Sequence, residues 1–557
     1  MKHLAPCFLF FSLVLGAMGQ SAVPPAESSH RATIAGIVTK DPGAEPVKKA
    51  VIEVIAENQQ QGGDYTAVSA PDGTFRIEGI LPGRYHMFVE RTGLLEADKR
   101  HANAQGRILT LSAGQELKDL QIRLQAAAVV RGRVTDEDGD PMAEAQVSVL
   151  RQTYGTGRSR WEPAGSERTN DLGEYRIAGL AAGSYYVSVN PPPDFKSLIE
   201  SDGHADAASA SEKPAMSYQT SYYPGTADRG QASPIQLHAG DDFPVNFSLV
   251  PSPTLHVRGA VVNLPPRSSA TIMLQSREFN VVLNGAEIHK DGSFVIHDVA
   301  PGSYTILATV ENAPVQMMAR QTLQVANNVE GVRLAPLPGA SVRGRMRVEG
   351  KGVTGRVDLG QMFLSLHPSD GDDESASMFT IGGGFSYLAH VGADGTFEWK
   401  NVPPGSYNVR LGDTGAQTDW FLKAVQAGGR DASEGRLTVN GGPLTLDIVA
   451  SADGAQIEGV VVDSKGEPVA DAVVVVAPDR LARGDLFQKT VSDQRGRFTI
   501  RGISPGKYSL FAWEAVEGEA YYNPDFLKSF EGHATSLQMN EGEHRSLQVE
   551  VIAAPQD

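Results

Sequence analysis

The chain has 557 residues, including 59 glycines and 33 prolines, and a formal net charge of −17 at neutral pH. This length predicts several domains, and the many turn-forming residues are typical of an all-β protein. The acidic charge argues against nucleic acid as a partner, because nucleic-acid-binding surfaces are basic, and it favours solubility instead.

The N-terminus has the features of a secretory signal: a charged start, a largely apolar run over residues 4–15 and small residues at positions 17 and 19. We expect residues 1–19 to be removed and residues 20–31 to form a linker; an uncleaved membrane anchor is the alternative. The only cysteine is Cys7, so a mature chain would have no disulfide. No later apolar run reaches the length of about 18 residues that a spanning helix needs.

One motif occurs five times in the rest of the chain. Its first copy contains Asp72-Gly73, an alternating segment over residues 75–80, Pro82-Gly83 and Tyr85. Asp-Gly and Pro-Gly predict turns, because Gly accepts a positive φ, and the alternation between them predicts a half-buried strand. The five copies lie roughly 100 residues apart, which is the size of an independent domain. The tyrosines that end them are Tyr85, Tyr185, Tyr304, Tyr407 and Tyr508.

Similar strand patterns surround each copy. A segment with an internal glycine opens each unit, as in residues 33–38, and such a glycine usually marks a bulge or a close backbone approach. In the first unit a second strand is predicted over residues 46–54, and a final pair of segments, 108–111 and 120–124, closes the unit. Six or seven short alternating strands in a unit of this size predict a small antiparallel sandwich.

We therefore predict an all-β protein with about five tandem small antiparallel β-sandwich domains, prealbumin-like or Ig-like, joined like beads on a string. The expected domains are residues 32–127, 128–252, 253–338, 339–452 and 453–557. Insertions distinguish two of them. Residues 191–217 are polar and rich in Ala and Ser, and residues 367–384 contain an acidic stretch at 370–374.

The opening glycine strand, the Pro-Val…Ala-Val strand and the Asp-Gly…Pro-Gly-x-Tyr hairpin together resemble carboxypeptidase regulatory-like domains. These share a transthyretin-like sandwich with Cna-B-like and starch-binding-like modules. The resemblance covers nearly all of residues 32–555 and is closest in the first, second and fifth units. It implies the fold, and only loosely a function, because the module is an accessory in zinc carboxypeptidases and occurs in strings in secreted bacterial proteins.

The sequence contains no recognised set of catalytic residues. It has no His-Glu-x-x-His or His-x-x-Glu zinc motif, no P-loop and no dinucleotide fingerprint. We predict no enzyme activity, no cofactor and no metal. The acidic stretch 370–374 lacks the alternating spacing of a calcium loop, so a solvated loop is preferred to a calcium site. The turn aspartates are expected to cap their own backbone; they are Asp72, Asp171, Asp291, Asp394 and Asp493.

Aromatic side chains are the remaining functional signal. Pairs of them precede the last strands of three units, and a further tryptophan stands in the variable loop of the second. Exposed aromatic rings stack on sugars in carbohydrate-binding sandwiches, whereas the alternative is that they pack these loops onto their own domains. The candidate ligand-binding residues are Tyr222, Tyr223, Trp420, Tyr521, Tyr522 and Trp161. Trp399, in the hairpin, is expected in a core.

These observations predict a secreted, non-enzymatic binding or adhesion protein at the cell surface or in the periplasm. Polysaccharide is the ligand class that the family resemblance implies, and surface proteins are the other expected partners. The alternative is a structural spacer or protein–protein scaffold with no small ligand, which would use exposed sheet edges for docking. Solvent-facing aromatic pairs would favour binding, and buried pairs would favour the scaffold.

Overall fold

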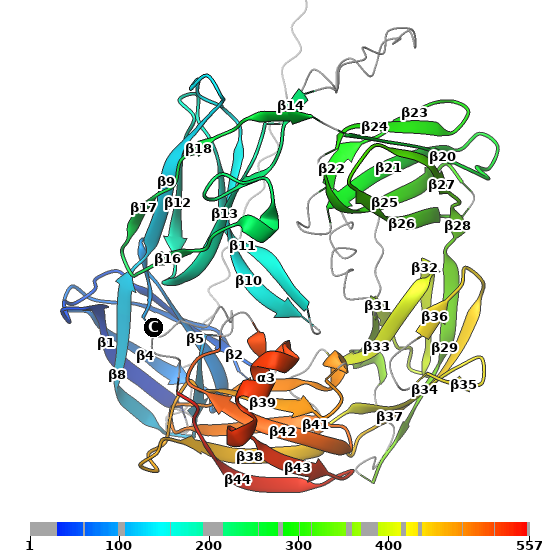
Figure 1. Cartoon of the computed structure of the whole chain (residues 1–557). Coiled ribbons are helices and arrows are strands. Elements are labelled where there is room, and N and C mark those ends of the chain that lie inside the picture. The colour runs from blue at the N-terminus through cyan, green and yellow to red at the C-terminus, as the bar shows by residue number, and fades with distance from the viewer. Residues whose placement is uncertain are drawn as a thin grey trace, which may run out of the picture.

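A computed structural model provides the structure of this chain. It describes residues 31–58, 62–97, 106–155, 158–192, 216–253, 255–276, 282–299, 301–313, 315–351, 359–368, 388–413, 419–432, 437–481, 483–516 and 519–553. The predicted signal segment 1–19, nearly all of the linker 20–31 and the acidic stretch 370–374 lie outside these residues. The described chain is almost entirely β and forms five sandwiches in succession (Figure 1).

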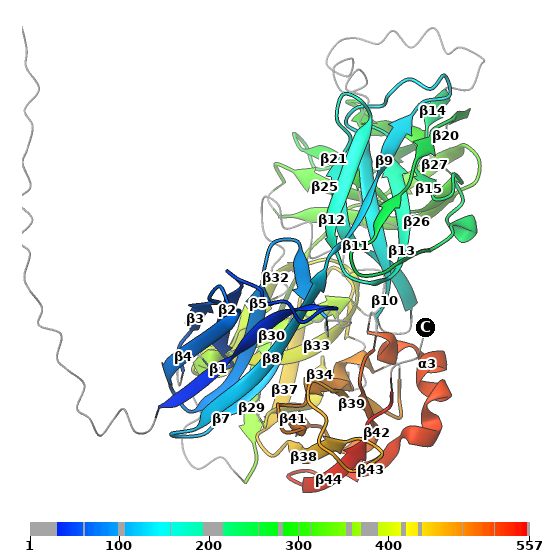
Figure 2. The same ribbon diagram turned by 90° about the vertical axis from the view of Figure 1, so that its left-hand side faces the viewer.

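The sandwiches are arranged around a ring rather than along a line. In Figure 1 the chain passes from blue through cyan, green and yellow to red, so that the fifth sandwich returns beside the first. The view in Figure 2, turned by 90°, shows the first sandwich to one side of the fifth and the second and third above them. The predicted domain boundaries stay predictions; the sandwiches are named below by their strands.

Sandwich 1 shows the arrangement that the others repeat. One sheet has the strand order β4-β1-β8-β6 and the other β3-β2-β5-β7. Its strands are β1 (Ala32–Asp41), β2 (Val51–Ala56), β3 (Tyr65–Val68), β4 (Thr74–Ile80), β5 (Gly83–Glu90), β6 (Leu94–Glu96), β7 (Arg107–Leu111) and β8 (Glu116–Ala126).

Sandwiches 2 and 3 follow. Sandwich 2 consists of β9 (Ala128–Thr135), β10 (Gln146–Gly155), β11 (Arg158–Arg168), β12 (Glu174–Leu180), β13 (Gly183–Asn190), β14 (Met216–Tyr218), β15 (Ser221–Tyr222), the 3-10 turn η1 (Arg229–Gln231), β16 (Ile235–Leu237), β17 (Asp242–Pro244), β18 (Phe247–Ser248) and β19 (Pro251–Pro253). Sandwich 3 consists of β20 (Leu255–Val261), β21 (Ser269–Ser276), β22 (Val282–Gly285), β23 (Glu287–Ile288), β24 (Ser293–Val299), β25 (Gly302–Glu311), β26 (Met317–Val325), β27 (Val329–Leu334) and β28 (Leu337–Pro338).

Sandwiches 4 and 5 complete the ring. Sandwich 4 consists of β29 (Ala340–Glu349), η2 (Leu359–Gln361), β30 (Met362–Pro368), β31 (Leu388–His390), β32 (Thr396–Val402), β33 (Gly405–Asp413), β34 (Phe421–Ala427), β35 (Arg430–Asp431), β36 (Leu437–Val439) and β37 (Leu444–Ser451). Sandwich 5 consists of β38 (Ala455–Val462), β39 (Val473–Pro478), η4 (Gly484–Leu486), β40 (Gln488–Val491), β41 (Arg497–Ile503), β42 (Gly506–Trp513), η5 (Ala520–Tyr522), α3 (Pro524–Ser529), η6 (Glu531–His533), β43 (Thr535–Met539) and β44 (His544–Glu550).

The two segments that close each unit do not pair with each other. In sandwich 1, β7 pairs with β5 in one sheet, whereas β8 crosses to the other sheet and pairs with the opening strand β1. The pairing of β8 with β1 is parallel, while β4 lies antiparallel on the other side of β1. Each sandwich is thus mainly antiparallel, and its opening strand also pairs in parallel with a strand near the end of the unit; in sandwich 2 that partner is divided into β17 and β18.

The Asp-Gly turn has one geometry in all five copies. In the first, the amide of Gly73 donates to the carbonyl of Ala70, and the φ of Gly73 is 79°, which suits a residue without a Cβ. Asp72 accepts from the Thr74 amide and hydroxyl, and these bonds lower the pKa of its carboxyl. Asp291, Asp394 and Asp493 also cap their own turns, as predicted.

The second copy departs from this prediction. There Asn170, and not Asp171, accepts hydrogen bonds from the amides of Leu172 and Glu174. The turn consists of four residues and ends at the glycine. A side chain at its first or third position can accept a hydrogen bond from a backbone amide two residues further along the chain. Asn170 and Asp493 occupy the first position, and Asp72 occupies the third.

The opening glycines are sites of close backbone approach, as predicted. A Cβ on Gly132 would lie 1.6 Å from the carbonyl oxygen of Val245. The position directly across the antiparallel pair is aromatic in every sandwich, such as Tyr175 opposite Gly132, so the ring covers the space that the glycine leaves. Trp399 is buried in the core of sandwich 4, as expected.

The tyrosine that ends the motif ties down the second turn. The hydroxyl of Tyr85 donates to the carbonyl of Leu81, four residues earlier, over 2.6 Å. The same bond occurs from Tyr185, Tyr407 and Tyr508. Each of these rings lies in the core of its own sandwich, so the motif joins a turn on the surface to the packing beneath it.

Candidate functional site

The aromatic pair of sandwich 2 faces inward. Tyr222 is only 2% exposed, and β15, which carries it, pairs with β13. Tyr223 is partly buried and packs against the same core. Burial leaves the ring of Tyr222 unable to stack on a sugar, which favours the packing alternative for this pair.

Trp161 of β11 lies close to this pair. Its ring stacks on Tyr186 with a centroid separation of 4.0 Å, and the Arg229 guanidinium lies 4.3 Å from the ring centroid. Two groups so close to one ring must lie on opposite faces, so both faces of the indole are covered. A sugar could stack here only after displacing Arg229.

The aromatic pair of sandwich 5 belongs to a second apolar cluster outside the sandwich core. The cluster lies between the outer face of β39 and β42 and the helical segment with η5 and α3. Tyr521 is 2% exposed, and its hydroxyl donates to Glu519. The pKa of Tyr521 is raised, chiefly by burial. Tyr522 is half-buried against Phe487. The pair therefore attaches the helical segment to the sheet.

Trp420 occupies a different place, between sandwiches 4 and 5. It is half-buried and lines a cavity of about 160 Å³ together with Arg410 of β33 and residues around η4, including the ion-paired Arg483 and Asp485. The cavity is smaller than the ~300–1,000 Å³ of ordinary ligand pockets. Trp420 is the predicted site residue that lines this cavity.

The first and last sandwiches meet at a junction that the sequence analysis did not predict. The side-chain amide of Gln494 accepts from the Thr110 backbone amide over 3.0 Å and donates to the Thr110 carbonyl over 2.8 Å. Thr110 is on β7, an edge strand, so Gln494 satisfies backbone groups that the sheet leaves unpaired. Arg84, opposite Thr110 on β5, donates to the Thr490 hydroxyl and the Val491 carbonyl.

Sandwich 2 also reaches sandwich 5. Tyr154, near the end of β10, packs against the outer cluster of sandwich 5. On its other side, sandwich 5 is joined to sandwich 4, where Lys423 pairs with Glu541 over 3.0 Å and the Gly454 amide donates to Asp419. Sandwich 5 is thus held by three others, and it closes the ring.

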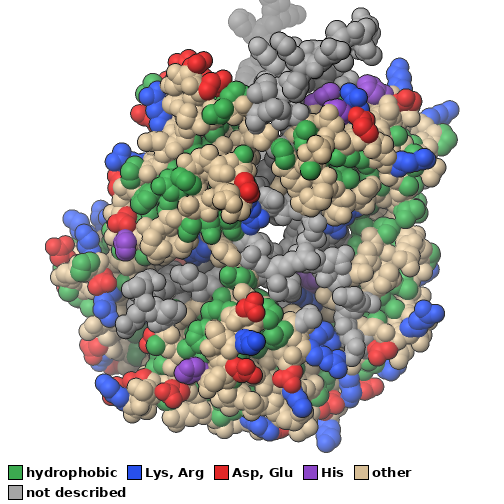
Figure 3. Space-filling model, viewed as in Figure 1, with side chains coloured by type: hydrophobic (Ala, Val, Ile, Leu, Met, Phe, Trp, Pro, Cys, Tyr) green, Lys and Arg blue, Asp and Glu red, His purple; other side chains and the backbone are tan. Residues whose placement is uncertain are grey.

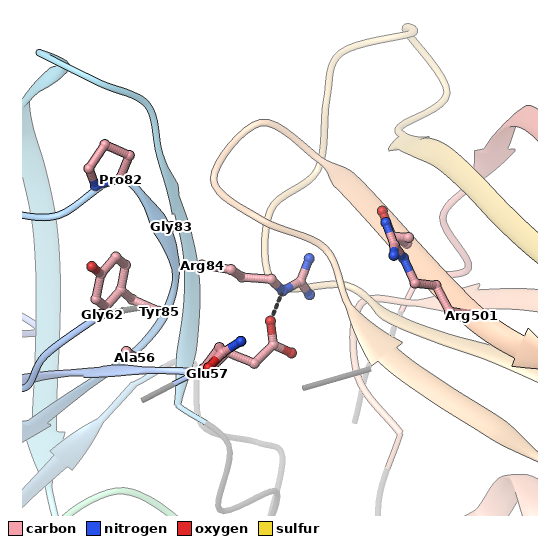
Figure 4. A pocket seen from close by; sticks show the side chains of 10 residues that line it. Ala56, Glu57, Gly62, Pro82, Gly83, Arg84, Tyr85 and Arg501 are labelled. Carbon is pink, nitrogen blue, oxygen red and sulfur yellow. Dashed lines mark ion pairs between the residues drawn. The ribbon is translucent and has the colours of Figure 1, made fainter. Parts of the chain in front are cut away.

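A polar pocket of about 410 Å³ opens at this junction, and we call it the junction pocket. Sandwich 1 contributes Glu57, Asn58, Pro82, Gly83 and Arg84, among others, and sandwich 5 contributes Thr499 and Arg501. Figure 4 shows Arg84 and Glu57 on one wall, joined by an ion pair of 3.1 Å, with Arg501 on the wall opposite. The two walls therefore bring two arginines and one carboxylate around a shared space.

One signal in the sequence distinguishes Arg84. The residue between Pro-Gly or Ala-Gly and the motif tyrosine is Ser in the second, third and fourth copies, Lys in the fifth and Arg only in the first. Gln494 carried no comparable signal, because a polar residue in a turn is ordinary. Figure 3 shows acidic and basic side chains interspersed over the face that it draws.

Among the residues that the structure describes, no three His, Cys, Asp or Glu side chains gather into a metal-binding group. Within the same part of the chain, no helix combines the length and the apolar character needed to cross a membrane.

Comparison with solved structures gives low overall similarity. The Bacillus anthracis TIE protein is 9% identical with a TM-score of 0.15, and the match covers 91% of this chain and 75% of that one. A streptococcal ancillary pilin is 12% identical with a TM-score of 0.17, covering 55% and 99%. A minor pilin of Streptococcus agalactiae is 13% identical with a TM-score of 0.20, covering 41% and 98%. No curated protein matches the chain.

The family comparison concerns the individual sandwiches. The model of the carboxypeptidase regulatory-like domain matches residues 33–125, 129–209 and 456–525. These segments fall in sandwiches 1, 2 and 5, where the sequence resemblance is closest. All five sandwiches share the same hairpin geometry, the same opening glycine and the same parallel pair. The chain therefore carries carboxypeptidase regulatory-like domains in sandwiches 1, 2 and 5.

Proposed function

We propose that this chain is a secreted, non-enzymatic binding or adhesion protein with carbohydrate as its ligand class. The observation that carries the proposal is the junction pocket. Its volume of about 410 Å³ suits a small ligand. Arg84, Glu57, Asn58 and Thr499 in its walls are side chains that can donate to and accept from sugar hydroxyls. Secretion rests on the predicted signal segment 1–19.

A second candidate is a structural scaffold with no small ligand. The burial of Tyr222 and Tyr521 supports it, because these rings serve packing rather than an open binding face. The contacts that close the ring support it too, since they hold five sandwiches in one arrangement. Under this candidate the sandwiches would position protein partners at the cell surface.

A glycan-array screen of the mature protein separates the two candidates. Saturable binding of a glycan supports the first, and its absence over the whole array supports the scaffold. The Tyr521→Ala/Tyr522→Ala variant is measured beside it. Because Tyr521 is buried, we expect this variant to lose about 3–5 kcal/mol of stability. Leu172→Ala is the control, since Leu172 is 55% exposed and should change stability by under about 0.5 kcal/mol.

A further inference from the structure

The junction pocket has an uneven charge. The positive charge of Arg84 is matched by Glu57, 3.1 Å away, and both side chains are 21% exposed. Arg501 lies on the opposite wall and is exposed, and none of the ion pairs found among the described residues includes it. The charged lining therefore carries one excess positive charge, in a chain whose formal net charge is −17.

We propose that the junction pocket binds a sugar that carries a single carboxylate, such as a uronic-acid unit. This inference rests on the proposed carbohydrate-binding function and adds the charge and the place of the ligand. Arg501 is the partner of the carboxylate, because a guanidinium presents two parallel N–H groups to the two carboxylate oxygens. The carboxylate of Glu57 repels a ligand with more than one negative charge, so a phosphate dianion fits this lining less well.

The remaining lining suits the hydroxyls of the sugar. Thr499 stands two residues before Arg501 on β41, so both side chains project from the same face of the strand. Asn58 and Glu57 follow the end of β2 on the other wall. A sugar ring between the walls is within reach of a hydroxyl, an amide and a carboxylate, which together both donate and accept hydrogen bonds.

The walls belong to sandwiches at opposite ends of the chain, and this links the ligand to the closure of the ring. A ligand that contacts both Arg501 and Glu57 interacts only with the closed arrangement. It must therefore shift any equilibrium between open and closed arrangements toward the closed one. Binding should make the molecule more compact and raise its thermal stability.

The test is isothermal titration calorimetry of the mature protein with galacturonate, which carries one carboxylate, and with its neutral counterpart, galactose. The variant is Arg501→Gln, and the matched control is Arg497→Gln. Arg497 is exposed on the same strand and the same face but does not line the pocket. Melting curves of both variants without ligand establish that they are folded.

We expect galacturonate to bind at least about tenfold more tightly than galactose, and Arg501→Gln to remove that difference, as the loss of a charge-assisted pair implies. Arg497→Gln should bind like the wild type. Equal binding of the two sugars, or an unchanged affinity in Arg501→Gln, overturns the acidic-sugar inference while leaving carbohydrate binding in place. If neither sugar binds, the inference is also overturned, and the glycan array then decides the proposed function separately.

Discussion

Gly132 lies where the backbone of β9 passes closest to its parallel neighbour. The carbonyl of Val245 occupies the place of a side chain, with 1.6 Å between its oxygen and a Cβ built on the glycine. The Val245 carbonyl is a backbone group between β17 and β18, and the amide of Val245 is bonded to Arg131 of β9, so the carbonyl cannot turn aside as a flexible side chain would. A glycine is therefore needed at position 132 because the neighbouring segment leaves no room for a Cβ, and not because the φ of Gly132 is positive.

Replacing this glycine should destabilise sandwich 2. We expect Gly132→Ala to cost about 1–3 kcal/mol or more, because the new methyl group forces the parallel strands apart. Gly442→Ala is the matched control, since a Cβ there meets nothing within 4 Å. Calorimetry of both variants checks this, with one melting transition shifted in Gly132→Ala and none in the control. Equal melting curves would contradict the close-approach interpretation.

Alkaline pH should destabilise sandwich 5 through Tyr508. Burial raises the pKa of this tyrosine to about 12, above the ordinary value of about 10 that it has when unfolded. The folded state therefore holds the proton more tightly, so its stabilisation is complete below pH ~10 and is lost as pH rises toward 12. Thermal unfolding measured across that range checks how steeply stability falls with pH, and Tyr508→Phe should reduce this dependence, with the raised pKa of Tyr521 accounting for the remainder. A wild-type curve with no slope in this window would contradict the assignment.

At the residue scale, the sequence predicted most of the local features. The turns, the close approach at the glycines and the burial of Trp399 all follow from local chemistry that the chain repeats. The cap in the second copy was misassigned to Asp171, because the sequence shows which polar residues are near a turn but not which one points at its amides. Asn170 does so because it occupies the first position of that turn.

Among the elements, α3 and its neighbours distinguish sandwich 5. The strand β39 is buried along its whole length, because the core covers one face and the helical segment covers the other. A continuous run of valines is what such a strand requires. The outer cluster that results also receives Tyr154 from sandwich 2, so an element added to one sandwich becomes part of the attachment between two.

Detaching α3 should expose β39. Leu527→Ala removes the buried leucine of α3, and we expect a loss of about 2–5 kcal/mol. Hydrogen exchange measures this loss of stability, and we expect the amides of β39 and β42 to exchange faster in Leu527→Ala than in the wild type. Lys528→Ala is the matched control, because Lys528 is the next residue and is exposed. If the two variants exchange alike, the helical segment does not protect the sheet.

Strand pairing was predicted less well than strand existence. Residues 108–111 and 120–124 were correctly predicted as strands, yet they join different sheets. Alternation identifies the buried face of a strand, but both sheets of a sandwich offer the same kind of core. The sequence pattern therefore could not assign each strand to its sheet.

At the scale of the whole molecule, the junction between sandwiches 1 and 5 is made by a few polar contacts between residues far apart in the sequence. Gln494 and Thr110 are 384 positions apart, and they share no periodic pattern that would indicate a contact. The same holds for Arg84 and the backbone of Val491. The junction pocket could not be predicted for this reason, since it exists only where two separately folded sandwiches meet.

Removing the Gln494 amide should open the ring. Gln494→Ala deletes two hydrogen bonds, worth about 1–3 kcal/mol together. We expect a larger radius of gyration by small-angle X-ray scattering, with the melting of the individual sandwiches unchanged. Arg495→Ala is the control, because Arg495 is adjacent and exposed. Unchanged scattering from Gln494→Ala would mean that other contacts suffice to close the ring.

The parallel pairing of the opening strand with a closing strand also affects how each sandwich resists a pulling force. The chain enters at the start of one strand and leaves at the end of its parallel neighbour, so tension loads the hydrogen bonds between them in shear, all together. This ladder runs from Val342 to Glu349 in sandwich 4 but only from Val257 to Val261 in sandwich 3. Under load, sandwich 3 should therefore extend before sandwich 4, whose ladder is longer.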